Sequence, residues 1–98
     1  MTQLSMLDRE VLGWLLDDYE SPSSLASDIS RELGLPTSEA EVAASLARLT
    51  TLGLATAYLY DAAASAYRPV ASSAVPADVQ TWYFATNDGR AVVEASDG

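Results

Sequence analysis

The stretch of sequence that decides the fold is residues 38–54, which read SEAEVAASLARLTTLGL. Ser38 followed three residues later by Glu41 is the pattern of a capping box, which marks the start of a helix. Three apolar residues follow at i, i+4 and i+7: Val42, Leu46 and Leu49. Gly53 is a helix stop, because glycine tolerates the left-handed backbone that ends many helices. The stretch therefore predicts a helix over about residues 38–52.

Two further helices are predicted before this one. Ser5 is a candidate N-cap for a helix over about residues 6–19, whose apolar side chains share one face: Val11, Leu12, Leu15, Leu16 and Tyr19. Residues 20–23 are expected to break this helix, because Pro22 inside it would lose a backbone hydrogen bond. A second helix is expected over about residues 23–33, with Gly34 as its stop.

After Gly53 the apolar period changes, and alternating β-formers predict three strands. Their expected ranges are about 55–60, 66–70 and 81–85. Pro69 confines the second strand to an edge or a strand end. The segment Asn87-Asp88-Gly89 leaves two alternatives open. It is either a hairpin turn between two strands, or Thr86 caps a short helix over about residues 87–95.

Three segments resemble parts of bacterial helix-turn-helix regulators. Residues 25–35, LASDISRELGL, resemble the second helix and its turn. Residues 42–54 resemble the third helix running into a wing strand, and their Leu-x-x-Leu-Gly-Leu ending is similar to that of PadR-like and MarR-like winged helices. Residues 83–90, YFATNDGR, resemble the passage from the last wing strand into a closing helix.

The resemblance implies a winged helix in a single domain, residues 1–98. This fold is mainly α with a small antiparallel sheet (α+β), and it has a three-helix core, a β-wing and a short C-terminal helix. The resemblance thus favours a helix over a hairpin after Thr86. About twenty residues separate Tyr60 from Trp82, so the wing is either long or carries residues 66–70 as an extra strand.

The same resemblance implies binding of DNA, with the third helix in the major groove and the wing on the backbone or in the minor groove. The groove-facing positions would be Ser38, Glu39, Glu41, Ala44, Ser45 and Arg48. From these and the wing, the candidate DNA contacts are Ser38, Ser45, Arg48 and Arg68. The two glutamates are interpreted as helix-capping acids, since carboxylates are favoured in the first turn of a helix.

The net charge of the chain argues against DNA binding. The chain has 14 acidic and 5 basic residues, a formal net charge of −9, whereas DNA-binding proteins usually present a basic patch. The alternative hypothesis is an acidic winged helix that has lost DNA binding and acts through protein contacts. Four aromatic residues would supply a dimer or partner surface: Tyr58, Tyr60, Tyr67 and Trp82. We expect a homodimer.

Composition also excludes several kinds of chemistry. The chain has no cysteine and no histidine, which removes thiol nucleophiles, Cys/His zinc sites and histidine acid–base catalysis. No residues are assigned to catalysis, to a metal or to a cofactor, and we expect a non-enzymatic protein. No apolar run reaches the ~20 residues of a membrane helix, and residues 1–5 lack the features of a signal peptide. We therefore expect a cytoplasmic protein without membrane contact.

Overall fold

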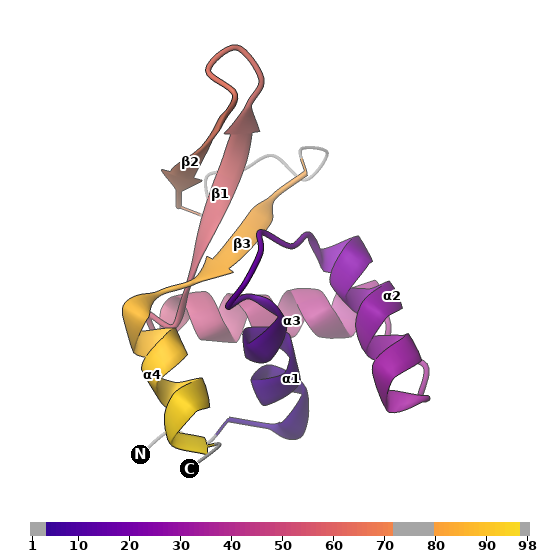
Figure 1. Cartoon of the computed structure of the whole chain (residues 1–98). Helices are drawn as coiled ribbons and strands as arrows, with labels where there is room; N and C mark the ends of the chain where they lie inside the picture. Colours follow the sequence, from indigo (N-terminus) through magenta and orange to yellow (C-terminus); the bar gives the residue numbers. More distant parts are fainter. Residues whose placement is uncertain (1–3, 72–79, 97–98) are drawn as a thin grey trace.

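The structure is a computed structural model that describes residues 4–71 and 80–96. Helices occupy one end of the described part and a β-hairpin rises from them, as Figure 1 shows. The elements, in chain order, are α1 (Met6–Trp14), α2 (Pro22–Leu33), α3 (Glu39–Thr51), β1 (Ala55–Asp61), β2 (Ala66–Val70), β3 (Trp82–Ala85) and α4 (Asn87–Ser96). This is the expected order of a winged helix. Among the described residues, no helix has the length and apolar character needed to cross a bilayer.

Serine side chains fix the start of each of the first three helices. Ser5 forms a full capping box with Asp8, and Ser21 forms one with Ser24. Pro22 was expected to break a helix. It occupies the first turn of α2, where its missing N–H costs no hydrogen bond. At α3, one hydrogen bond of the expected capping box is present: the Glu41 N–H donates to the Ser38 hydroxyl at 3.1 Å.

Helix α1 is shorter than its apolar pattern predicts. It ends at Trp14 rather than near Tyr19, because the chain beyond it pairs with β3. The Leu15 carbonyl accepts a hydrogen bond from the Ala85 N–H at 3.1 Å. Glu20 and Tyr83 exchange two backbone hydrogen bonds, of 3.0 and 2.8 Å. These long-range bonds outweigh the local preference of residues 15–19 for a helix.

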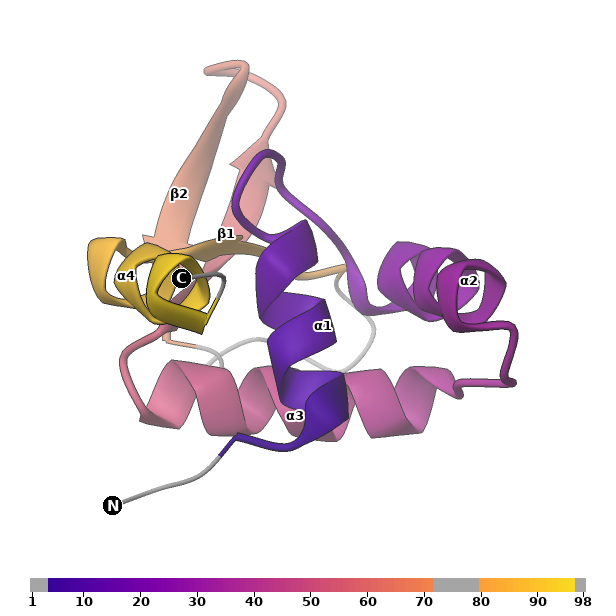
Figure 2. The same ribbon diagram turned by 60° about the horizontal axis from the view of Figure 1, so that its bottom comes forward.

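The core lies where the first three helices meet. In Figure 2, α1 crosses in front of α3, with α2 and α4 to its two sides. The fully buried apolar side chains come from these helices and the segment after α1: Val11, Leu12, Leu15, Leu25, Ile29, Val42, Leu46 and Leu49. These are the apolar positions that helical spacing predicts, and they account for the three-helix core.

The sheet has the order β2-β1-β3, and both pairings are antiparallel. Residues 66–70 are thus the extra strand, and Pro69 lies on an edge strand as expected; the rest of the long wing loop, residues 72–79, falls outside the described residues. The register places Tyr60 opposite Tyr67 and Tyr58 opposite Trp82. Because paired residues of antiparallel strands point to the same side, Tyr58, Tyr60, Tyr67 and Trp82 lie on one side of the sheet and Tyr83 lies on the other.

After β3 the chain enters a helix, so the hairpin alternative was wrong. Thr86 caps α4 by accepting a hydrogen bond from the Gly89 N–H at 3.0 Å. The same hydroxyl donates to the Gly53 carbonyl at 2.7 Å, and the Thr86 N–H donates to the Leu54 carbonyl at 3.0 Å. This junction joins the end of α3 to the start of α4. Gly89 is buried there, and a Cβ atom at this position would overlap the carbonyl oxygen of Leu54.

Two glycines in helices give a matched test of this packing. Gly89→Ala is expected to lower the free energy of unfolding by about 2 kcal/mol or more, because the added methyl has to displace backbone. Gly13→Ala in α1, where a Cβ has open space, is expected to raise it by about 0.5–1 kcal/mol. Urea unfolding followed by circular dichroism measures both, and equal effects of the two substitutions would contradict the α3–α4 junction described above.

Candidate nucleic-acid interface

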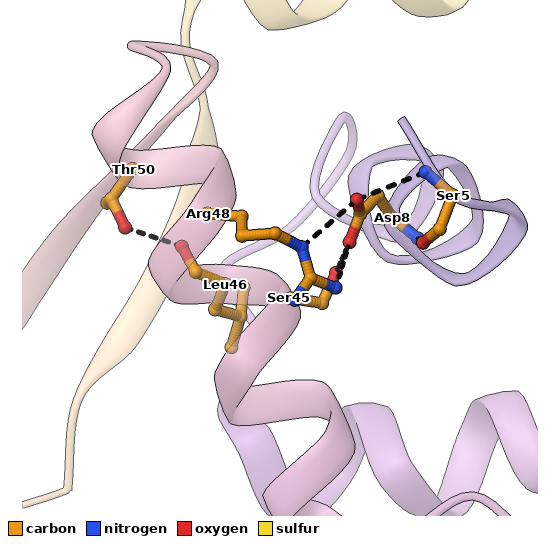
Figure 3. Close-up of polar contacts among 6 residues, drawn as sticks. All are labelled: Ser5, Asp8, Ser45, Leu46, Arg48 and Thr50. Atoms are coloured by element: carbon orange, nitrogen blue, oxygen red, sulfur yellow. Dashed lines mark hydrogen bonds and ion pairs between the residues drawn. The ribbon is translucent and has the colours of Figure 1, made fainter. Parts of the chain in front are cut away.

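A buried carboxylate of α1 holds two of the predicted site residues of α3. Asp8 accepts hydrogen bonds from the Ser45 hydroxyl at 2.6 Å and from Arg48 Nη2 at 2.7 Å, both on Oδ1. Its Oδ2 accepts from Arg48 Nε at 3.3 Å and from the Ser5 N–H at 3.1 Å. Figure 3 shows this group, which we call the Asp8 cluster: Ser5, Asp8, Ser45 and Arg48.

The Asp8 cluster is strongly polarised. The Asp8 side chain is only 3% exposed, and burial by itself would raise its pKa. Hydrogen bonds from Arg48, Ser45 and the Ser5 N–H, with the charge of the guanidinium, outweigh burial and lower the pKa of Asp8 from 3.8 to about 2. The hydrogen bond to Asp8 also raises the pKa of Arg48. The pair is therefore ionised across the physiological pH range.

Ser45 and Arg48, two of the predicted DNA contacts, differ in how accessible the Asp8 cluster leaves them. Ser45 is fully buried and its hydroxyl is directed to Asp8, so it offers no atom to a ligand in this structure. Its position was predictable, since Ser45 lies on the same helical arc as Val42, Leu46 and Leu49. Arg48 uses two N–H bonds on Asp8 and keeps 52% of its side chain exposed. It is oriented and accessible at once.

The outward face of α3 consists mostly of small, uncharged side chains. Opposite its buried residues lie five exposed ones: Ala40, Ala43, Ala44, Ala47 and Thr51. Glu39 and Glu41 are exposed at the start of the helix, next to the N-cap Ser38. Arg48 lies at the edge of this face, toward α1. A ligand of α3 would thus meet alanine methyl groups between carboxylates at one end and a single arginine at the other.

The wing contributes one further cation, and it also has a carboxylate partner. Arg68 Nε lies 2.8 Å from Asp61 Oδ2, across the hairpin between β1 and β2. Asp61 also accepts backbone hydrogen bonds from Ala63 and Ala64 in the turn. Arg68 is exposed, so its pairing is open to solvent and weak. The structure does not bring Arg68 into contact with the Asp8 cluster.

The aromatic residues predicted for a partner surface pack largely on one another. Tyr19, from the connection between α1 and α2, stacks on Tyr67 with ring centroids 3.8 Å apart and an interplanar angle of 8°. It also meets the edge of Tyr58 at 5.1 Å, and Tyr67 contacts Trp82 at 5.9 Å. Tyr60 remains 49% exposed. The sequence pattern had assigned Tyr19 to a helix face, so its part in this cluster was missed.

Lowering the pH tests the Asp8 cluster. Because the pKa of Asp8 is lower in the folded chain than its usual 3.8, its contribution to stability is complete above pH ~4 and is lost as the pH falls toward 2. The loss is expected to be on the order of 2 kcal/mol. Asp8→Asn is expected to remove this acid-dependent component and to lower the free energy of unfolding at pH 7 by about 2–3 kcal/mol.

Urea unfolding between pH 2 and 7 measures this component. Asp17→Asn is the matched control, because it removes an exposed carboxylate just beyond the same helix. If Asp8→Asn retains the acid-dependent loss of the parent chain, Asp8 is not the group responsible and the described pairing is wrong.

No protein-family model and no curated protein sequence matches this chain. The chain is similar in structure to Bacillus subtilis PadR, solved in complex with operator DNA, with a TM-score of 0.68 and 18% sequence identity. The match covers 96% of this chain and 48% of the PadR chain, so this chain spans about half the length of that protein. In the described residues, four helices and a three-stranded antiparallel sheet follow one another in the order of a PadR-like winged helix, and this fold is what the two proteins share.

Proposed function

We propose that this chain is a winged-helix domain of the transcription-regulator type that binds double-stranded DNA through α3 and the wing. The observation that carries the proposal is Arg48, which the Asp8 cluster holds in one orientation at the exposed edge of α3. An arginine that is already oriented loses less side-chain entropy when it donates to a phosphate or a guanine. The likeness to a PadR solved with operator DNA supports this role for the fold.

The neutral face of α3 defines what such a contact would be like. Alanine methyl groups make apolar contacts with the methyl group of thymine, and their small size lets a helix lie deep in the major groove. Ser38, Arg48 and Arg68 are the predicted contacts that remain accessible. Because the net charge is −9 and only two of these residues are cationic, we propose that few phosphates are neutralised and that binding is weak.

Salt dependence measures the number of phosphates contacted. We expect tens of micromolar protein to bind a labelled duplex of mixed sequence at about 50 mM salt. Fluorescence anisotropy of the labelled duplex measures this binding. Two phosphate contacts predict a slope of log K against log salt near −2, far shallower than that of a strongly basic regulator. Arg48→Ala is expected to weaken binding about tenfold, because it removes the oriented cation.

Arg9→Ala is the matched control for charge. It removes the same formal charge from α1, where Arg9 lines a groove away from the outward face of α3, and it is expected to change the affinity much less than Arg48→Ala. Absence of binding at about 50 mM salt would overturn the proposal. So would equal effects of the two arginine substitutions, because binding would then follow net charge alone.

A second candidate function is contact with a protein through the same face of α3. The observation in its favour is that Glu39 and Glu41 lie on the same exposed face as several alanines. Carboxylates repel phosphates, whereas small side chains allow another helix to pack closely. A chain that fails to bind any duplex yet self-associates in sedimentation equilibrium would favour this candidate. The expected homodimer remains a prediction that the same measurement tests.

A further inference from the structure

A groove of about 880 Å³ is lined by α1 and the segment after it, with Glu32 from the end of α2 and Val92 and Val93 from α4. Figure 2 shows α1 lying between these two helices. Helix α3 contributes none of the lining residues of the groove. Its apolar lining consists chiefly of Met6, Gly13, Trp14, Leu16, Val92 and Val93. Met6 is 73% exposed, the highest value among the large apolar residues that the structure describes as exposed. The groove thus presents apolar surface to solvent.

Carboxylates surround this apolar surface. The lining of the groove contains one basic residue, Arg9. It contains five acidic residues: Glu10, Asp17, Asp18, Glu20 and Glu32. Burial, and then the charges of Asp28 and Asp18, raise the pKa of Glu20, although its hydrogen bond from Ser24 acts in the opposite direction. Of these two charges only that of Asp18 belongs to the groove lining, so Glu20 and Asp18 are close enough to repel each other, and a cation placed beside them would relieve this repulsion.

Gly13 is the one glycine among the lining residues of the groove. It lies within α1, where a glycine costs about 0.5–1 kcal/mol relative to alanine. Neither of the usual structural reasons for a glycine applies here, because its φ is not positive and a Cβ atom would meet nothing within 4 Å. What the missing side chain provides is open space at one of the lining positions that α1 contributes to the groove.

We propose that this groove is a docking site for a basic amphipathic helix of a protein partner, a function separate from DNA binding by α3. The apolar side of such a helix would lie over Gly13 and against Val93, and its lysine or arginine residues would pair with the acidic rim. Charge complementarity identifies the occupant as basic. A second copy of this chain would bring the same five carboxylates to the interface, and like charges brought together there oppose association.

The probe for this proposal is a labelled peptide of about 18 residues, five helical turns, with leucine on one face and lysine on the other. Its controls are a scrambled peptide of the same composition and an acidic version with glutamate for lysine. Anisotropy titration with the whole chain is expected to show the amphipathic basic peptide binding at least about tenfold more tightly than the scrambled one. The acidic peptide is expected not to bind.

Substitutions in the groove locate the site. Gly13→Phe places a large side chain in this open space and is expected to weaken peptide binding about tenfold, whereas Gly13→Ala is expected to retain it. Asp17→Lys, on an exposed residue of the rim, is expected to weaken binding without disturbing the core, which keeps the test valid if Gly13→Phe fails to fold.

Three results would overturn the proposal. Equal binding of the amphipathic and scrambled peptides would show only attraction to a chain of net charge −9. Peptide binding that is unchanged in folded Gly13→Phe and in Asp17→Lys would place the peptide elsewhere. Self-association of the chain that Gly13→Phe abolishes would show that a second copy occupies the groove. None of these results bears on DNA binding, which Arg48→Ala tests separately.

Discussion

The buried carboxylate of Asp8 is the interaction on which the arrangement of the helices depends. Removing a carboxylate from water is costly unless hydrogen bonds and a counter-charge replace the lost hydration. Asp8 obtains both from the Ser5 N–H, Ser45 and Arg48. Since Asp8 also belongs to the capping box of α1, one side chain sets where α1 begins, how it meets α3 and how Arg48 is oriented. A change at Asp8 should therefore affect stability and the exposed edge of α3 together.

The two ends of the sheet connect this helical core to the wing. Near the core, Thr86 joins the end of α3 to α4, and Glu20 pairs with Tyr83 beside the sheet. Farther out, Tyr19 packs into the aromatic residues of β1, β2 and β3. Most of the aromatic surface is thus used within the chain. Among the described residues, the outward face of α3 and the acidic groove along α1 are two accessible surfaces that differ in charge and suit different ligands.

Local signals in the sequence predict most of the fold. Serine caps, glycine stops and the change from helical to alternating spacing predict the order of the elements, with bounds close to those found. The end of α1 was missed because backbone bonds from residues 15 and 20 to β3 decide it, and no local pattern reports such bonds. The face occupied by each aromatic residue depends on strand register, which spacing alone does not fix.

The candidate site was predictable only in part. The resemblance placed Arg48 on the exposed side of the third helix, where the structure also has it, but it placed Ser45 there too. Helical spacing would have assigned Ser45 to the buried arc. The partner of both residues, Asp8, lies 40 positions before Arg48 in the chain, so its role depends on the folded structure. The most direct test is a titration of the Asp8 side-chain carboxyl carbon by NMR. We expect this carboxyl group to titrate with a pKa of about 2, and titration near the usual 3.8 would contradict its pairing with Ser45 and Arg48.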